Sequence, residues 1–597
     1  MDVFFVISGY LISSAVIREV DAGVFTFSGF YERRIRRIFP ALIVMLAVVS
    51  AMAYRFLLPS ELSDFAGSMI AAISSYANLW FSRQPTGYFA APSSLKPLLH
   101  TWSLGVEEQF YFVMPILVVI VARFARRQLK ACVLTLAMVS FLFSIYYVRQ
   151  NPTLAFYLAP LRAWELLIGT IVSQKYLPTI HASVGRNLAS AAGFLLILTP
   201  ALLYRGDTPF PGLEAIPPCL GAALIIAAGE TGPSVVGRLL SLRPVVFVGL
   251  ISYSFYLWHW PLIVFNDLGS LFSQLPASDR RIKAFLFVVS IIVATISWRF
   301  VETPFRKGRL RPGRKSLFVV TGLSVAMLVT AGVLVLQSRG LPGRFPQPAL
   351  DAAGFLSYKE NASFREGTCF IGVEKNDQMA QYDRQVCLPE SPGKTAVLIM
   401  GDSHAAQLWS GIHTVYPELA VQQATVASCP LYLDRPADSL RPACKPMADF
   451  LYHDYLPKHP VDVILWGQRW NAAMIPEVAR TLSWMKHQGF EVYLVGPTIE
   501  YDSRFPRVLA LSLRQGNQSL IESHQLESAR QLDRDFASLA REQWHVGYLS
   551  YFQTLCQPDC PSYGAPGVPL MFDYDHLTAA GSTLFFRDLR ESHQLPW

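Results

Sequence analysis

The chain has 597 residues, too many for a single soluble core, and a net charge of +8. Hydrophobic residues make up 52% of it and charged residues only 16%, against roughly 25% in a typical soluble protein, which excludes an entirely soluble chain. The basic residues gather in short loops between apolar runs and no nucleic-acid-binding motif occurs, so we expect a lipid bilayer, and no nucleic acid, as partner.

Apolar runs fill the chain up to about residue 340, and a spanning helix needs roughly 20 such residues. We expect helices near 2–17, 40–58, 65–82, 103–122, 131–148, 154–173, 187–203, 215–229, 244–265, 284–300 and 317–337. The most basic loops are 33–37, 123–130 and 306–315, and all three are expected on the cytoplasmic side.

The number of crossings between these loops tests the prediction. Six segments separate loop 123–130 from loop 306–315, which agrees with both loops lying inside. Three segments separate loop 33–37 from loop 123–130, so one of them does not span fully. We expect that 65–82, which is rich in small and polar residues, or the Pro-rich stretch 87–100 enters the bilayer and returns, beside a cavity.

The same parity places both ends of this region. The helix at 317–337 carries the chain outward, so residues after it are expected to be extracytoplasmic. Residue 1 is also expected outside, and the simplest account is about ten spanning helices with one preceding helix missing. The alternative is an N-out protein with a short first helix.

Several charged groups fall within the predicted spans, where charge is costly. Glu107 and Glu108 are adjacent and cannot share one helix face, so at least one is expected to face a polar cavity. Arg162 and Glu165 stand at i, i+3 and either pair with each other or serve function. His259 is flanked by aromatic residues, which favours an interfacial anchor over a catalytic group.

Four arginines in one short loop, Arg33, Arg34, Arg36 and Arg37, have two interpretations. They are a topology signal, and they are also suited to phosphate capture, because guanidinium groups bind phosphate bidentately. A cytoplasmic acyl donor that carries phosphates, such as a coenzyme A thioester, would need such a site.

The C-terminal part alternates short apolar strands with amphipathic stretches, which predicts a parallel sheet with helices on both faces. The strands are expected at 396–400, 461–466, 491–495 and 546–549, and the helices near 404–416, 475–488 and 519–541. Six cysteines lie in this part: Cys369, Cys387, Cys429, Cys444, Cys556 and Cys560. Their even number favours disulfides in an oxidising compartment over a zinc site at Cys556 and Cys560.

Ser403 follows the first strand in a Gly-Asp-Ser turn, and an Asp-x-x-His segment comes some 170 residues later. Catalytic sites in such sheets lie beyond the carboxyl ends of the strands. We therefore predict Ser403 as nucleophile, His576 as base and Asp573 as its orienter, with Asp575 as the alternative orienter. The plainer interpretation of Ser403 is a turn serine or helix cap.

Five motifs resemble those of the membrane acyltransferase-3 family. They are 2–12 (DVFFVISGYLI), 30–40 (FYERRIRRIFP), 102–111 (WSLGVEEQFY), 252–261 (SYSFYLWHWP) and 302–306 (ETPFR), and the C-terminal part looks like the SGNH hydrolase-type domain fused to many members. The resemblance implies an O-acyltransferase that uses cytoplasmic acetyl-CoA to acetylate extracytoplasmic glycans: O-antigen, other surface polysaccharide or peptidoglycan. It implies a multipass protein of the bacterial inner membrane with a periplasmic C-terminal domain.

The resemblance also assigns residues. The family's Arg-x-x-Arg motif, associated with the donor, maps to Arg34 and Arg37 or to Arg33 and Arg36, and its acidic pair maps to Glu107 and Glu108. The SGNH pattern places oxyanion donors at the backbone of Ser403, at Gly467 and, where its Gly-x-Asn block has Arg469, at nearby Asn471. The family's first helix, with a basic residue and a His eleven positions on, is absent here.

Together these features predict a polytopic α-helical membrane domain at 1–337, a linker or extension at 338–390 and an SGNH-like three-layer α/β domain at 391–597. We expect acetyl-CoA as acyl donor, no permanently bound cofactor and no metal. Two other functions stay open: a membrane-anchored glycan O-acyl esterase, and a transporter with an extracytoplasmic binding domain.

Overall fold

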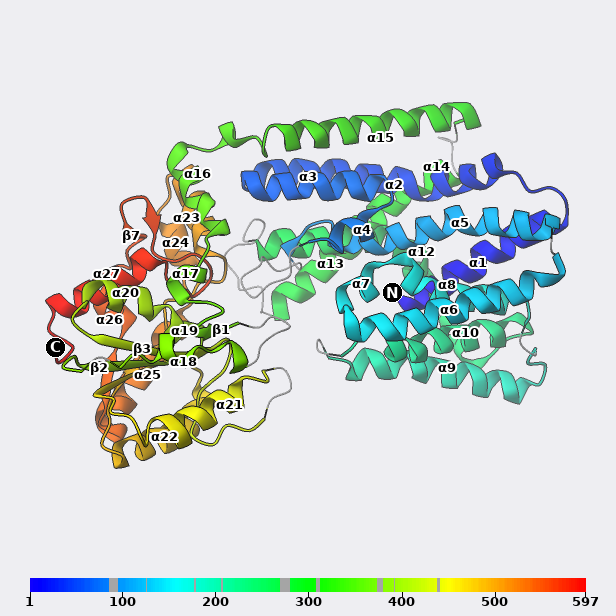
Figure 1. The fold of residues 1–597 in the computed structure, drawn as a ribbon. Helices are drawn as coiled ribbons and strands as arrows, with labels where there is room; N and C mark the ends of the chain where they lie inside the picture. The colour runs from blue at the N-terminus through cyan, green and yellow to red at the C-terminus, as the bar shows by residue number, and fades with distance from the viewer. Residues whose placement is uncertain are drawn as a thin grey trace. The chain divides into compact units, whose positions relative to one another are not determined.

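The computed structural model describes all residues except 85–94, 125, 177–178, 206–207, 269–279, 308–311, 373–378, 391 and 438–440. Parts of the predicted stretch 87–100 and of the loops 123–130 and 306–315 therefore lie outside the described residues. The described chain forms two compact units, one up to Leu341 and one from Pro342 to Trp597 (Figure 1).

Ten helical segments of the described chain are long and apolar enough to cross a membrane, which confirms the predicted number. They are α1 (Asp2–Asp21), α2 (Phe27–Phe56), α5 (Trp102–Phe124), α6 (Leu129–Gln150), α7 with α8 (Pro152–Tyr157, Ala159–Ser173), α9 (Ser183–Leu203), η4 with α10 (Gly212–Ala215, Ile216–Glu230), α12 (Arg243–Asp267), α13 with η5 and α14 (Arg280–Ser297, Trp298–Glu302, Thr303–Lys307) and α15 (Arg314–Gln337). The predicted segment 65–82 contains the second half of α3 (Pro59–Ile73) and all of α4 (Ala77–Phe81), and neither helix is among the ten described spans.

Lipid is the environment that these helices require. In α15, only 6% of the most apolar 18-residue stretch is buried within the structure, and Val319, Leu323 and Met327 are exposed. Apolar surface of this extent would be unfavourable in water but suits the hydrocarbon core of a bilayer. The first unit is therefore a membrane body whose outer surface is solvated by lipid.

Close packing inside the membrane body depends on small residues. A side chain at Gly9 of α1 would lie 1.8 Å from the carbonyl oxygen of Leu166 in α8, and one at Gly169 of α8 would lie 2.0 Å from that of Val6. The two backbones are thus in direct contact, as at other small-residue helix crossings in membranes.

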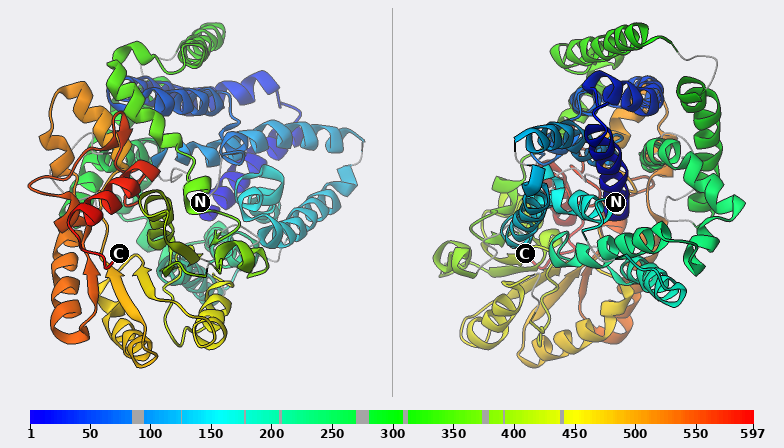
Figure 2. Two further views of the ribbon diagram at one scale, coloured as in Figure 1. Left: turned by 60° about the vertical axis from the view of Figure 1, so that its left-hand side comes forward. Right: turned by 90° about the vertical axis from the view of Figure 1, so that its right-hand side faces the viewer.

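The second unit is a six-stranded parallel sheet with helices on both faces, as predicted (Figures 1 and 2). Its strand order is β1-β3-β2-β4-β5-β6, with β1 (Phe370–Ile371), β2 (Ala396–Gly401), β3 (Ala420–Val426), β4 (Val463–Gly467), β5 (Glu491–Val495) and β6 (Gly547–Leu549). Since β2 lies between β3 and β4, the chain changes direction across the sheet at β2, and ligand sites form at such a switch point.

Helices cover both faces of this sheet. One face packs against α21 (Cys444–Asp449), α22 (Ile475–His487) and α25 (Glu527–Leu539), and on the other α20 (Leu408–Val415) packs against α27 (Ala579–Glu591) (Figure 1). The remaining helices are α16 (Gln347–Gly354), α17 (Asn361–Phe364), α18 (Arg384–Cys387), α19 (Ser403–Ala406), α23 (Phe505–Gln515), α24 (Ser519–Ser523) and α26 (Tyr551–Leu555).

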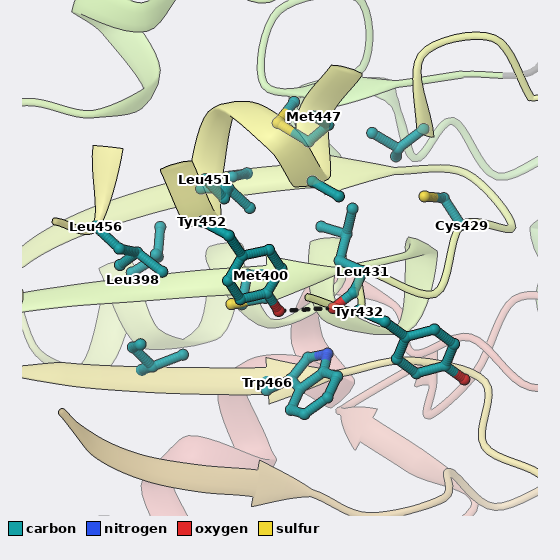
Figure 3. Close-up of a cluster of buried hydrophobic side chains, with 14 of the residues drawn as sticks. Leu398, Met400, Cys429, Leu431, Tyr432, Met447, Leu451, Tyr452, Leu456 and Trp466 are labelled. Carbon is teal, nitrogen blue, oxygen red and sulfur yellow. Dashed lines mark hydrogen bonds between the residues drawn. The ribbon is translucent and has the colours of Figure 1, made fainter. Parts of the chain in front are cut away.

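Apolar side chains fill the space between the sheet and α21 and α22. Leu398 and Met400 of β2 and Trp466 of β4 belong to one buried cluster with Met447 and Leu451 (Figure 3). The hydroxyl of the buried Tyr452 donates to the carbonyl of Leu431 at 2.8 Å, which satisfies the polar group of this core residue (Figure 3).

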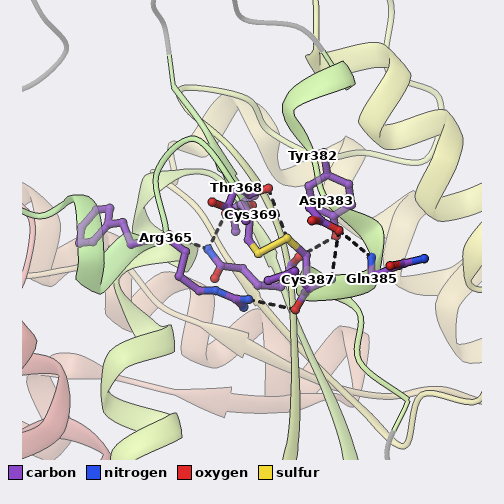
Figure 4. The surroundings of a disulfide bond; sticks show 11 residues. Arg365, Thr368, Cys369, Tyr382, Asp383, Gln385 and Cys387 are labelled. Carbon is purple, nitrogen blue, oxygen red and sulfur yellow. Dashed lines mark hydrogen bonds between the residues drawn. A yellow bond between two sulfur atoms is a disulfide. The ribbon is translucent and has the colours of Figure 1, made fainter.

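The segment 338–390, expected to be a linker or extension, contributes to the sheet. It supplies β1, which pairs in parallel with β3, and Tyr382 donates to the carbonyl of Gln423 in β3 at 2.7 Å. The Cys369–Cys387 disulfide closes this segment beside β1 (Figure 4). The structure also contains the Cys429–Cys444 and Cys556–Cys560 disulfides, which confirms that these six cysteines form bridges.

A sharp turn follows β2. Gly401 has φ +136°, and a Cβ there would lie 1.7 Å from the carbonyl oxygen of Gly467 in the neighbouring strand. Asp402 then fixes the turn with both carboxylate oxygens, which accept from the backbone N–H groups of His404 and Arg469, each at 2.9 Å. The turn delivers Ser403 to the first position of α19.

We predict that Gly401→Ala destabilises the α/β domain by roughly 2–6 kcal/mol, because backbone strain and a steric overlap add. Gly489→Ala is the matched control: Gly489 has φ +86°, but no atom lies within 4 Å of the place that its Cβ would take, so only about 1–2 kcal/mol is expected. Unfolding of the full-length chain in detergent measures both, and equal losses would contradict the steric explanation.

Candidate active site

The structure brings the three predicted catalytic side chains together. The Ser403 hydroxyl lies 2.8 Å from Nε2 of His576, and Nδ1 of His576 lies 2.8 Å from a carboxylate oxygen of Asp573. Because a carboxylate only accepts, Nδ1 carries the proton and Nε2 is free to take one from the serine. All three groups are buried, and their arrangement is the one expected of a nucleophile, a base and an orienting acid.

The loop that carries the base is held by its own hydrogen bonds. The second carboxylate oxygen of Asp573 accepts from the backbone N–H groups of Asp575 at 3.1 Å and His576 at 2.8 Å. Gln407, between α19 and α20, accepts from the N–H of Leu577 at 2.6 Å. The nucleophile and base segments, which are far apart in the sequence, are thus joined next to the reacting atoms.

A second carboxylate also reaches the base. Asp575 lies 3.0 Å from Nδ1 of His576 and 3.4 Å from Nε2 of His404, and Arg469 lies 3.3 Å from it. The sequence did not favour this arrangement, because adjacent residues seldom turn their side chains toward each other. They do so here because the segment is a tight turn around Asp573, not a helix or strand.

Electrostatics at this cluster favour a protonated base. Burial alone would lower the pKa of His576, but Asp573 and Asp575 outweigh it and hold that pKa well above 6.5. Burial would raise the pKa of Asp575, but His576 and His404 hold it well below its usual range. For Asp402, burial dominates and raises the pKa.

The predicted oxyanion donors lie in different surroundings. Gly467 ends β4 opposite Gly401, and a Cβ at Gly467 would lie 3.4 Å from the Cα of Ala405, so its backbone adjoins the nucleophile turn. Asn471 is exposed, and its side chain accepts from the N–H of Ala473, as the cap of η10 (Ala472–Met474). The structure therefore shows the Asn471 side chain in a capping role, and its role as an oxyanion donor stays a prediction.

A separate cavity of about 530 Å³ lies within the membrane body. Arg34 and Arg37 of α2 line it together with Glu107, Ser103 and Tyr111 of α5, so Glu107 is the member of the acidic pair that faces a cavity. The Tyr111 hydroxyl lies 3.0 Å from the Glu107 carboxylate.

The predicted loop 33–37 is helical and belongs to α2, and its other two arginines have carboxylate partners outside the cavity. Arg33 forms an ion pair with Glu19 at 2.8 Å, and Arg36 forms one with Glu32 at 2.9 Å. Of the two registers that the sequence left open, the structure therefore directs the one with Arg34 and Arg37 toward the cavity.

The other candidate residues of the spans, Arg162, Glu165, Glu108 and His259, do not line this cavity. Arg162 pairs with Glu165 at 3.0 Å and with Asp2 at 2.6 Å in a buried cluster between α8 and α1. Glu108 is half-buried and interacts with Arg34. His259 lines a second cavity of about 520 Å³ between α12 and α13.

Three features of the catalytic cluster were not identified from the sequence. His404 contacts Asp575, Thr498 lies 3.2 Å from Nδ1 of His404, and Arg469 lies 3.5 Å from Glu500. The only signal for His404 was its position directly after the nucleophile. Arg469 was marked only by occupying the place of the expected Asn.

Comparison with known proteins gives two family matches. A family model described as an acyltransferase domain matches residues 1–301, and one described as an SGNH domain fused to AT3 domains matches residues 368–591.

Curated relatives match more than half of the chain. The O-acetyltransferase OatA of Staphylococcus aureus strain MRSA252 is 29% identical over 57% of this chain and 58% of its own length, and that of strain NCTC 8325 is 29% identical over 56% and 58%. The chain thus spans just under three fifths of these relatives. A solved Salmonella ser. Paratyphi A lipopolysaccharide acetyltransferase periplasmic domain covers 41% of this chain and 97% of its own, with 18% identity and a TM-score of 0.34.

The charge cluster predicts a specific pH dependence of stability. Because folding raises the pKa of His576, its protonated form stabilises the fold, and this stabilisation is complete below about pH 6.5. It is lost as the pH rises through the pKa that His576 has in the folded chain. The lowered Asp575 pKa stabilises the fold above about pH 3.8 and is lost as the pH falls through its folded-state value. The stability difference between the native chain and Asp575→Asn should therefore be largest between about pH 4 and 6.5 and should narrow at higher pH.

Melting temperatures of both chains across this range measure the difference. A gap that widens above pH 7 would contradict the expected attraction between Asp575 and protonated His576.

Proposed function

Because this chain belongs to the acyltransferase family whose domain model matches residues 1–301, we propose that it is a membrane-bound O-acyltransferase. It transfers an acyl group, expected to be acetyl, from cytoplasmic acetyl-CoA to hydroxyls of an extracytoplasmic glycan. The observation that carries this proposal is the hydrogen-bonded Ser403, His576 and Asp573 in a domain of the kind fused to such membrane bodies.

The catalytic cluster can perform the last transfer. His576 takes the proton of Ser403 as the serine oxygen attacks the acyl carbonyl, and the tetrahedral species collapses to an acyl-enzyme as His576 returns the proton to the leaving group. A glycan hydroxyl then attacks the acyl-enzyme, giving its proton to His576, and the ester forms as Ser403 regains a proton. Asp573 holds the imidazole in the tautomer that both steps need.

The cavity of the membrane body is suited to the donor. Two arginines that line it, Arg34 and Arg37, would face phosphate groups. They belong to the basic segment 33–37 of α2, which is predicted to lie on the cytoplasmic side. Glu107 and Tyr111 lie within the same cavity and offer groups that can give a proton to the coenzyme A thiolate as it leaves. The acyl group would pass here from the sulfur of coenzyme A to an acceptor hydroxyl, whose proton is lost as the thiolate gains one.

The second domain is proposed to be extracytoplasmic, in the periplasm of a bacterium whose inner membrane holds the helices. The three disulfides of this domain support an oxidising compartment. The relatives named O-acetyltransferase support the reaction class. The acceptor would be O-antigen, another surface polysaccharide or peptidoglycan.

The alternatives fare differently. A transporter would have no use for an aligned Ser403, Asp573 and His576, so the two distances of 2.8 Å between these side chains argue against the transporter hypothesis. An esterase would share the same acyl-enzyme, so it is an outcome of the experiment below.

Ser403→Ala should lower glycan O-acetylation by at least about 10³-fold, because the nucleophile is lost while the fold is kept. The measurement is transfer of labelled acetyl from acetyl-CoA to cell-surface glycan in membranes that contain the full-length chain. Unchanged labelling would exclude Ser403 from transfer. Deacetylation of acetylated glycan without any transfer would establish the esterase instead.

Arg34→Gln and Arg37→Gln should each raise the KM for acetyl-CoA about 10-fold or more, through loss of a guanidinium contact with a phosphate group. Arg33→Gln is the matched control, because Arg33 forms an ion pair with Glu19, and the KM of this variant for acetyl-CoA should change little. An equal effect at all three positions would show that the loop acts only through its total charge.

A further inference from the structure

The most unusual feature of the catalytic cluster is that the base has two carboxylates at one nitrogen. Asp573 accepts the Nδ1 hydrogen bond at 2.8 Å, and Asp575 lies 3.0 Å from the same atom. A single orienting acid is sufficient for a triad. The second carboxylate is buried, so its presence at this point needs a compensating role.

The two carboxylates are held in different ways. Asp573 is committed to its own loop, since it also accepts two backbone N–H groups there. Asp575 instead faces outward from that loop, toward His404 at 3.4 Å and Arg469 at 3.3 Å. Asp573 therefore fixes the orientation of the ring, while Asp575 links the ring to groups on two other elements.

These two groups differ in their access to solvent. His404 is buried next to the nucleophile, with its ring centroid 4.8 Å from that of His576. The Arg469 side chain is 62% exposed and also contacts Glu500 at 3.5 Å. Arg469 thus brings a positive charge from the rim of the site to the carboxylate that faces the base.

We propose that Asp575 is a second charge partner of the catalytic base and that Arg469 is a positioning residue that opposes it, so that the pair sets the pH range in which His576 accepts a proton. The proposal rests on the proposed function of Ser403 and His576. It adds two residues, Asp575 and Arg469, that act through the base and not on the reacting carbonyl.

The physical basis is the sign of each charge. A negative charge at Asp575 stabilises the protonated imidazole, and a positive charge at Arg469 weakens that effect. Within the described residues, other charged or titratable groups that face His576 include Asp573 on its own loop, Asp402 and His404 at the nucleophile turn, and Glu360 before α17. These are unchanged when Asp575 or Arg469 is replaced, so the two substitutions isolate the proposed pair.

The experiment is the pH profile of kcat/KM for p-nitrophenyl acetate hydrolysis by the purified full-length chain in detergent. The acidic limb of this profile reports the pKa of the catalytic base in the enzyme without bound substrate. Asp575→Asn should move the limb to lower pH by about 1–3 units, because an opposite charge close to the imidazole is removed. Arg469→Gln should move it to higher pH by roughly 0.5 unit, because the guanidinium is exposed and one contact further away.

Opposite shifts support the proposal, since a general loss of structure would not move the limb in two directions. Shifts of the same sign, or an unmoved limb in Arg469→Gln, would overturn it. Arg469 is exposed, so this variant gives a result even if Asp575→Asn fails to fold. Ser403→Ala separates the two levels: activity that persists at every pH in Ser403→Ala would contradict the proposed function, whatever the limbs show.

Discussion

The catalytic cluster depends on the contact between two strands at their carboxyl ends. Gly401 and Gly467 stand side by side in β2 and β4, and the carbonyl of Gly467 occupies the space that a side chain at Gly401 would need. This contact lets β2 end in a turn with positive φ, which aims Ser403 toward the loop of His576. The hydrogen bonds of Asp402 then hold both sides of the turn in place.

Within the membrane body, charge is arranged by pairing. Arg33, Arg36 and Arg162 each have a carboxylate partner, whereas Arg34 and Arg37 line a cavity. Charge within a bilayer is costly, so each of these arginines has an acidic residue nearby, and only Arg34 and Arg37 among them also line the cavity, where a ligand can reach them. The two arginine positions that the sequence could not separate are distinguished by their partners.

Much of the fold was predictable because its signals are strong. The apolar runs predicted ten spanning helices, parity indicated that one further segment does not span, and four of the six strands of the parallel sheet matched apolar runs. β3 was missed because its sequence includes Gln422 and Gln423, whose burial is made possible by hydrogen bonds to other segments. β1 is only two residues long and exists through its pairing with β3.

The catalytic site was partly predictable for a similar reason. Ser403, Asp573 and His576 carry a local sequence pattern, whereas the contacts of His404 and Arg469 with Asp575 are tertiary and have no such pattern. Asn471 was assigned to the oxyanion site from its spacing alone, and in the structure its side chain caps a short helical turn.

The cysteines of the second domain have a consequence for its biogenesis. Each bridge joins a cysteine to the next one along the chain, across separations of 18, 15 and 4 residues. In a domain exported as proposed, the two partners of each bridge would emerge nearly together, and each bond would form before the following pair arrives. This order of pairing leaves few opportunities for mismatched disulfides that a catalyst would have to reshuffle.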